Sequence, residues 1–442
     1  MTTRKLLPAI LLGAGVVSVT PVMASMGNIG TTYGVLPSDI ASAQALSLFN
    51  SQVSATYYNP AYLTKDSRGE LTTGLMHAEH ELRGDGQVLQ DSPSQQVLLG
   101  MKTDLTSLTQ YEHPLYLGFM LGVEKYGDEM LSFNSQTSTE GQFFEYGRQP
   151  LFLNLGGGTQ LWRGLDAGFS ARITLHSEAE LVASSTLAGE TSYETLNVSA
   201  KPSIRPIFGL NMDFGESFCG DDRSCWMNGL EAAFSYRGYS NTNTTVDSTI
   251  TIPGTVVDPG INLAITTIDS YQPNIYAAGL AYGRDRWRVG VTLEMQEWSS
   301  LEEELEGDTI KDQAVEADGD ARLAFKDIVV PRIGGEFHLD DTYMITGGVA
   351  FSESPLDSTG SLEVNYLDTD KWIVGVGLTA QYTSVPILAY PVRLDLAYQY
   401  QKLESREFDL YDRRSPSYPA PYGSGEVDGE VSVFTGSITL KF

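Results

Sequence analysis

Apolar and polar side chains alternate strictly along much of this 442-residue chain. Between residues 165 and 175, which read LDAGFSARITL, the odd-numbered positions are apolar and the even-numbered ones are polar or glycine. The segments 286–296 and 392–401 alternate in the same way. Because successive side chains of a strand point to opposite sides, this pattern predicts strands with one apolar and one polar face.

The same alternation recurs along the chain and predicts fourteen strands. An even number of strands is typical of single-chain bacterial outer-membrane barrels, in which the apolar face of each strand meets lipid. The fold class that we predict is therefore all-β, a 14-stranded antiparallel transmembrane β-barrel. The predicted strands are 69–83, 94–104, 114–127, 143–160, 165–184, 191–215, 229–250, 261–283, 286–299, 325–338, 342–353, 366–384, 391–408 and 427–442.

The connections between these strands alternate in length. Short turns on the periplasmic side and long loops on the extracellular side are the outer-membrane arrangement. A soluble β-sandwich also has alternating strands, and it is the competing interpretation. The tight turns are Trp162–Gly164, Arg284–Asp285 and Asp340–Asp341, and the long polar loops are 128–142, 300–324 and 409–426.

Aromatic residues support the same orientation. Trp162, Trp226 and Trp287 lie at or beside predicted periplasmic turns. A girdle at the membrane interface explains them, and ordinary core packing is the alternative. The last strand, SVFTGSITLKF, is amphipathic and ends in Phe442, which looks like the terminal signal of barrels recognised for outer-membrane assembly.

The N-terminus has the pattern of a secretory signal peptide. Arg4 and Lys5 precede a largely apolar stretch, 6–22, and small residues follow around Ala24. We predict cleavage after residue 24, with an uncleaved signal anchor as the alternative. No later apolar run is long enough for a transmembrane helix, so a barrel is the expected membrane structure.

Charge and cysteine content narrow the function. The chain carries a net charge of −28, which argues against nucleic-acid binding and is compatible with a saline habitat. Cys219 and Cys225 are predicted to form a disulfide in an oxidising compartment, because two cysteines without a nearby histidine cannot complete a zinc site. His77 and His80 would point to opposite faces of one strand and cannot share a metal ion. We expect neither a metal nor a cofactor.

Residues 25–68 do not alternate and precede the first strand. Ser38 and Asp39 can cap a short helix, and the segment is rich in small side chains before it reaches YYNPAYL at 57–63. Small side chains would let it pack inside a barrel. The predicted organisation is a signal peptide at 1–24, an N-terminal plug domain in the lumen at 25–68 and a transmembrane barrel at 69–442.

The segment 54–63, SATYYNPAYL, followed by fourteen predicted strands, resembles the FadL family of outer-membrane transporters. The resemblance implies passive uptake of long-chain fatty acids or hydrocarbons past a plug, with lateral exit into the membrane. It also implies that Asn59, Pro60 and Ala61 form a hatch against a kinked third strand.

Glycines on the inward face of the predicted third strand, 114–127, are the candidates for this kink. They are Gly118 and Gly122, since a glycine inside a strand permits a bulge or a close backbone approach. Relief of crowding against the plug is an equally good interpretation. Gly156–Gly158 is predicted to mark a sharp bend near a turn.

The substrate is less closely determined by the sequence. Arg172, Arg205 and Arg237 face inward and could contact a fatty-acid carboxylate. Inward acidic residues could instead neutralise them and make the barrel rigid. The acidic surplus and scarce lysine favour neutral hydrocarbons such as alkanes or aromatic compounds.

We expect a monomer in the outer membrane of a Gram-negative bacterium, in contact with lipid and lipopolysaccharide. A periplasmic or inner-membrane acceptor could take over the cargo. A lipase-like outer-membrane enzyme is an alternative function, but no G-x-S-x-G motif is present. An adhesin or receptor using the long loops is another.

Overall fold

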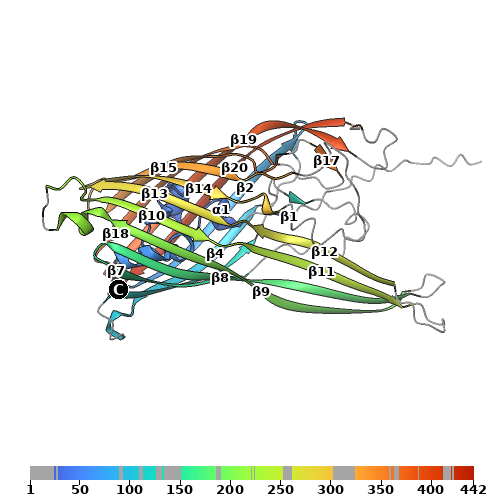
Figure 1. Cartoon of the computed structure of the whole chain (residues 1–442), viewed down its shortest axis with the longest axis horizontal. Coiled ribbons are helices and arrows are strands. Elements are labelled where there is room, and N and C mark those ends of the chain that lie inside the picture. The colour runs from blue at the N-terminus through green and yellow to red at the C-terminus, as the bar shows by residue number, and fades with distance from the viewer. Residues whose placement is uncertain are drawn as a thin grey trace, which may run out of the picture.

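The computed structural model shows a closed antiparallel barrel with an N-terminal segment inside it (Figure 1). Each wall strand pairs with the next, and the last strand, β20, closes the barrel by pairing with the first, β2. Closure leaves no sheet edge in the bilayer, where lipid offers no hydrogen-bond partner. The structure describes residues 24–25, 28–88, 93–108, 113–125, 132–133, 151–185, 191–220, 222, 224–251, 261–301, 324–357, 360–362, 368–386, 388–411, 420 and 423–442.

Fourteen strands form the wall, as predicted. They are β2 Glu70–Gly84, β4 Ser94–Asp104, β5 Leu115–Lys125, β7 Leu151–Trp162, β8 Leu165–Ser185, β9 Thr191–Asp213, β10 Leu230–Arg237, β13 Ile275–Arg284, β14 Trp287–Gln296, β15 Ile328–His338, β16 Tyr343–Ser352, β18 Lys371–Tyr382, β19 Val392–Tyr411 and β20 Gly423–Lys441. The remaining strands are β1 Ala24–Ser25, β3 Gln87–Val88, β6 Ser132–Phe133, β11 Ser240–Thr251, β12 Ile261–Gln272 and β17 Gly360–Leu362.

Two of the predicted strands are each broken into two. The strand predicted at 229–250 is interrupted at residues 238–239, which separate β10 from β11, and the one predicted at 261–283 is interrupted at 273–274, which separate β12 from β13. Pro273 stands at the second break and has no N–H to donate to a ladder. β15 begins later than predicted and β20 earlier, while residues 143–150 lie outside the described part of the chain.

The outer face of the barrel is apolar, as the alternation predicts. On β14 the outward residues include Val291 and Leu293, which are 45% and 52% exposed. Trp162, Trp226 and Trp287 are all exposed on the surface near the short-turn end, which excludes core packing and agrees with the girdle interpretation. At the tight turn after β7, Gly164 has a φ of +74°, a conformation that favours glycine.

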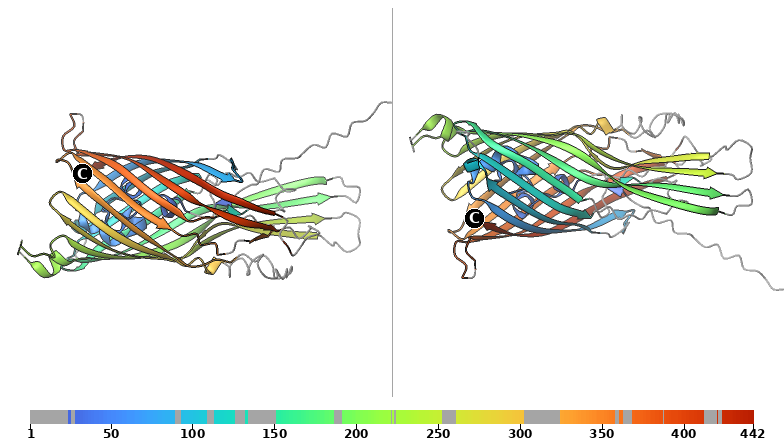
Figure 2. Two further views of the ribbon diagram at one scale, coloured as in Figure 1. Left: turned by 90° about the horizontal axis from the view of Figure 1, so that it is seen from above. Right: turned by 90° about the horizontal axis from the view of Figure 1, so that it is seen from below.

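The two ends of the barrel differ. The C-terminus lies at the end with the short turns, and β8, β9, β11 and β12 extend beyond the barrel at the opposite end (Figures 1 and 2). The loop between β9 and β10 belongs to the short-turn end and begins with a π-helical turn, η5 Gly215–Cys219. The predicted signal peptide remains a prediction, since residues 1–23 lie outside the described part of the chain.

Residues 28–66, which we call the lumenal segment, fill the barrel interior (Figure 2). Their short helices contact many wall strands: α2 packs on β16, β18 and β19, and η2 packs on β7, β8 and β9. Nearly every side chain of this segment is buried. No described helix is long and apolar enough to cross a bilayer. The helices are α1 Ile29–Thr32, α2 Pro37–Ala41, η1 Ser47–Phe49, α3 Ala55–Tyr58, η2 Pro60–Lys65 and, outside this segment, η3 Thr106–Leu108.

A charge on the outer face should destabilise the barrel. Val291 lies near the middle of β14, between Trp287 at the short-turn end and Gln296, so Val291→Arg places a guanidinium in hydrocarbon. We expect a loss of about 2–4 kcal/mol in the free energy of unfolding, measured by denaturant titration in lipid vesicles. Val291→Leu is the control and should change stability little; equal stability of both variants would contradict the assignment of this face to lipid.

Candidate functional site

The YYNPAYL stretch forms a compact double turn inside the barrel. Helix α3 ends at Tyr58, and Asn59 caps the following 3-10 helix by accepting a hydrogen bond from the Ala61 N–H at 3.3 Å. The Asn59 amide also donates to the Leu48 carbonyl at 3.0 Å and to the Leu210 carbonyl of β9 at 3.4 Å. Asn59 therefore ties this turn both to the lumenal segment and to the wall.

The Asn59–Ala61 turn lies on a row of glycines that crosses three neighbouring strands. Gly158, Gly168 and Gly209 are aligned by the registers of β7, β8 and β9. A Cβ at Gly158 would stand 2.5 Å from the Pro60 carbonyl oxygen, and one at Gly168 or Gly209 would overlap Pro60 or Asn59. This first glycine row lets the backbone of the turn reach the wall directly.

A second glycine row lies across four other strands. Gly290, Gly334, Gly348 and Gly375 are aligned across β14, β15, β16 and β18. A Cβ at Gly290 would stand 2.5 Å from the Leu46 side chain, and one at Gly348 or Gly375 would overlap backbone atoms of residues 40–42. The lumenal segment is thus in close contact with two separate parts of the wall.

The third strand of the barrel, β5, pairs regularly with its neighbours at the predicted glycines. Its pairings with β4 and β7 run past Gly118 and Gly122 without a register shift. A Cβ at Gly118 would stand 2.5 Å from Thr56 of the lumenal segment, whereas Gly122 faces the Phe152 ring. Relief of crowding against the lumenal segment therefore fits Gly118 but not Gly122, and a kink at these glycines stays a prediction. Gly156–Gly158 lies within β7, and its pairing with β8 continues there without a register shift.

Wall side chains donate hydrogen bonds to backbone carbonyls of the lumenal segment. These bonds satisfy carbonyls that the short helices leave without internal partners. In the other direction, the Val53 N–H donates to Glu70 at 2.6 Å. The wall donors are Lys102 to Ser51 at 2.8 Å, Thr292 to Ala45 at 2.8 Å, Arg332 to Ala43 at 3.1 Å, Gln399 to Ile40 at 3.0 Å and Gln401 to Thr32 at 3.1 Å.

The three arginines predicted as carboxylate contacts lie on adjacent strands. Arg172 of β8 is the register partner of Arg205 on β9. The guanidinium carbons of Arg172 and Arg237 stand 5.5 and 5.3 Å from the Tyr57 ring centre, within range of a cation–π interaction. All three are almost fully buried.

Protein groups already engage these arginines. Arg172 pairs with Glu124 at 2.7 Å, and Arg237 pairs with Glu294. Arg205 donates instead to neutral oxygens: the Gly238 carbonyl, the Gln272 side chain at 3.0 Å and the Pro273 carbonyl at 2.8 Å. The arrangement matches the structural alternative stated above, in which inward charges hold the barrel together; their role toward a substrate stays a prediction.

Two carboxyl groups of the lumenal segment show opposite pKa shifts. Burial raises the pKa of Asp39, although Asn50, Ser47 and the Leu36 N–H donate hydrogen bonds to it. Burial would also raise the pKa of Asp66, but the hydrogen bond and charge of Lys441, 2.9 Å away, outweigh it and hold that pKa below its usual range. Asp66 is therefore ionised, and its ion pair with Lys441 holds the end of the lumenal segment against β20.

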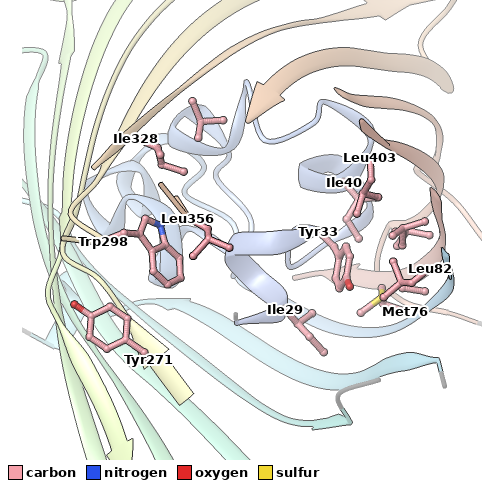
Figure 3. Close-up of a cluster of buried hydrophobic side chains, with 14 of the residues drawn as sticks. Ile29, Tyr33, Ile40, Met76, Leu82, Tyr271, Trp298, Ile328, Leu356 and Leu403 are labelled. Atoms are coloured by element: carbon pink, nitrogen blue, oxygen red, sulfur yellow. The ribbon is translucent and has the colours of Figure 1, made fainter. Parts of the chain in front are cut away.

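A cavity of about 100 Å³ lies between the lumenal segment and the long-loop end. Tyr33, Trp298, Ile328 and Leu403 give it an apolar lining, within a buried cluster that also includes Tyr271 (Figure 3). Its charged lining residues are balanced in sign: Arg332 and Lys371 against Glu353 and Asp368. The cavity can hold an apolar group beside a polar but neutral rim.

The remaining predicted residues lie outside this cavity or at its edge. Cys219 and Cys225 form a disulfide in the loop at the short-turn end. His77 is on the outer face, whereas His80 is buried and bonds the Tyr33 hydroxyl at 2.9 Å, so the two imidazoles lie on opposite faces as expected.

Sequence reasoning missed the two glycine rows and the contact of Arg288 with Tyr62 and Glu231. Glycines at inward positions of several strands were visible in the sequence. Their alignment into rows depends on the strand registers, which alternation alone does not give.

The fold and this interior define a class of protein: an outer-membrane β-barrel whose lumen is filled by its own N-terminal segment. Residues 271–442 match the family described as "Outer membrane protein transport protein (OMPP1/FadL/TodX)".

A relative also matches almost the whole chain. It is 55% identical to alkane uptake protein A of Marinobacter nauticus over 427 residues, which cover 96% of this chain and 93% of that protein. This chain therefore belongs to the FadL/TodX family of outer-membrane transport proteins, and it is a transporter rather than an enzyme.

Solved structures share the fold at low sequence identity. A Pseudomonas aeruginosa FadL homologue superposes with a TM-score of 0.56 at 12% identity, covering 92% of this chain and 98% of that one. The Pseudomonas putida toluene transporter TodX gives a TM-score of 0.53 at 12% identity, covering 93% and 99%.

Filling the first glycine row should disturb the lumenal segment. Gly168→Ala forces Asn59–Ala61 away from β8, and we expect a loss of about 1–3 kcal/mol from overpacking together with a higher ion conductance in planar bilayers. Gly347→Ala is the matched control, since its Cβ would meet only a carbonyl oxygen at 3.6 Å. Conductance and stability equal to wild type in Gly168→Ala would contradict the close packing of this row.

Proposed function

We propose that this protein takes up neutral long-chain hydrocarbons, with alkanes as the first candidates, by passive diffusion through the outer membrane. The observation that carries the choice of a neutral cargo is the engagement of the inward arginines by protein groups. Arg172 and Arg237 pair with glutamates, and Arg205 is held by three neutral oxygens. A fatty-acid carboxylate would have to enter a buried site in which glutamates already neutralise Arg172 and Arg237.

The 55% identical relative supports the same choice, because its name is alkane uptake protein A. The balanced charges around the cavity also suit a cargo without charge. Moving apolar surface from water into such a site is favourable by about 25 cal/mol per Å². A concentration gradient and consumption inside the cell would then suffice to drive uptake, without a cofactor or an energy source.

The lumenal segment acts as a plug in this proposal, and Asn59, Pro60 and Ala61 act as its hatch. Support comes from the Asn59 amide, which links the turn to β9, and from the first glycine row beneath it. Displacement of the turn would cost these contacts but no covalent change. Cargo would reach the cavity from the long-loop end and leave sideways, after which a periplasmic or inner-membrane acceptor could collect it.

Uptake of labelled hexadecane and labelled oleate, in cells with and without the gene, tests this function. We expect loss of the gene to lower hexadecane uptake strongly and oleate uptake little, since the inward arginines are occupied. Restoring the gene from a plasmid is the control. Equal hexadecane uptake in both strains would refute transport, and a selective loss of oleate uptake would overturn the neutral cargo.

A further inference from the structure

The backbone ladder between β9 and β10 ends early, inside the apolar height of the wall. The last ladder pair is Ile207 with Arg237, although β9 continues back to Thr191 and β11 continues up to Thr251. Over these described residues no ladder pair joins β9 to β11. Ile204, one residue from Arg205, is 61% exposed on the outer face, so the ladder ends where the barrel still faces lipid.

Local sequence explains why the ladder stops. Pro206 has no N–H, and its carbonyl receives a single backbone bond, from the Gly238 N–H at 2.8 Å. The chain breaks at residues 238–239 and at 273–274 fall at the same height, because Arg237 pairs with Ile275 just below them. Beyond these two breaks the neighbouring pair resumes its ladder at Ser240 and Gln272, and β9 stays paired with β8, so pairing is lost only between β9 and the strand that follows it.

Side chains close this junction in place of the ladder. Arg205 spans it, donating to the carbonyls of Gly238 and Pro273, which are the two break points, and to Gln272. A serine pair, Ser203 and Ser240, bridges the strands one step further along, with 2.7 Å between hydroxyl oxygens. We call the junction of residues 203–206 with 238–240 the seam.

A second early ending, between β15 and β16, differs in kind. That ladder stops at Arg332 and Ala350, but the two chains meet again in the Phe325–Leu356 bridge. Backbone bonds accompany this bridge, from the Lys326 N–H to Pro355 and from the Asp357 N–H to Ala324, both at 2.8 Å. Among the described residues, β11 does not rejoin β9; it meets the β8–β9 hairpin further along, in a short parallel ladder with β8 that joins Ser248–Thr251 to Leu181–Ser184.

The seam separates the cavity from lipid by a single layer. Gln272 and Pro273 line the cavity, and Arg205 bonds both of them from the wall. A series of aromatic rings leads from the cavity to the seam. Trp298 contacts Tyr271, and Tyr271 contacts Tyr239, each with 5.7 Å between ring centres. On the lipid side stand Phe208, Tyr236 and Tyr276.

We infer that cargo leaves the barrel sideways through the seam between β9 and β10, and that Arg205 is the positioning residue that latches it. Opening requires Arg205 and the serine pair to release their partners, together with the one backbone bond, while the ladder below stays intact. The inference rests on the proposed function and places its exit here rather than at β5, whose pairing is unbroken.

A disulfide across the seam tests the exit. A Cβ at Gly238 would point at the Pro206 ring, 2.8 Å from its Cγ, so Pro206→Cys with Gly238→Cys is placed to cross-link. We expect oxidation of this variant to lower hexadecane uptake to that of cells without the gene, and reduction to restore it. Met212→Cys with Ala232→Cys locks an existing pair on the same two strands and should leave uptake unchanged.

Each comparison uses one protein oxidised and reduced, which controls for folding, and wild type treated with reductant controls for the Cys219–Cys225 bond. Undiminished uptake by the oxidised seam variant, with wild type active, would overturn the exit and leave transport standing. Inactive wild type would instead refute the proposed function. Uptake blocked equally by the Met212–Ala232 disulfide would also overturn the exit, since that pair lies below the seam.

The latch has its own readout, the rate at which the seam cysteines cross-link. Arg205→Met should slow cross-linking of the seam pair several-fold, because the strands part more often, and Arg205→Lys should give an intermediate rate. The rate at the Met212–Ala232 pair should not change in either variant. Equal seam rates in all three backgrounds, or a parallel loss at both pairs, would contradict a latch role for Arg205.

Discussion

The backbone of a membrane barrel must find all its hydrogen-bond partners within the protein, and this constraint governs the rest of the structure. Closure of β20 on β2 meets it around the circumference. At Pro206 and Gly238 the ladder between β9 and β10 is interrupted. There the Arg205 guanidinium, in place of backbone N–H groups, donates hydrogen bonds to the backbone carbonyls. A wall that is sealed by a side chain can open at less cost than one that is sealed by a ladder, because fewer backbone groups lose partners. The same requirement that closes the barrel thus marks its most separable point.

The interior obeys the same requirement in a different way. The helices of the lumenal segment are too short to satisfy their own carbonyls, so side chains of the wall, such as Lys102 and Thr292, donate to them. Each such bond contributes about 0.5–1.5 kcal/mol net, which holds the segment without fixing it permanently. The two glycine rows bring the segment's backbone close to the wall, because a side chain at those positions would overlap it.

The charged side chains inside the barrel pair with one another and thereby stabilise the wall, rather than offering a site for a charged substrate. Glu124 and Glu294 stand against Arg172 and Arg237, around the aromatic ring of Tyr57. Buried charges without partners would be costly, and paired ones fix the positions of the strands that carry them. An interior balanced in this way gives no strong preference to a charged cargo and leaves apolar contact as the main attraction.

The sequence by itself determined the barrel, its fourteen strands, the lipid-facing girdle and the interior location of the segment before β2. Those features depend on local alternation and on end signals, which each strand carries independently. Alternation also placed Gly118, Gly168 and Arg205 on the inward face. Only the tertiary structure decided which inward residues meet, because a row across several strands depends on register, and a shift by one residue changes every partner. For that reason the packing of Gly118 against Thr56, and the end of the β9–β10 ladder at Pro206 and Gly238, could be found only in the folded chain.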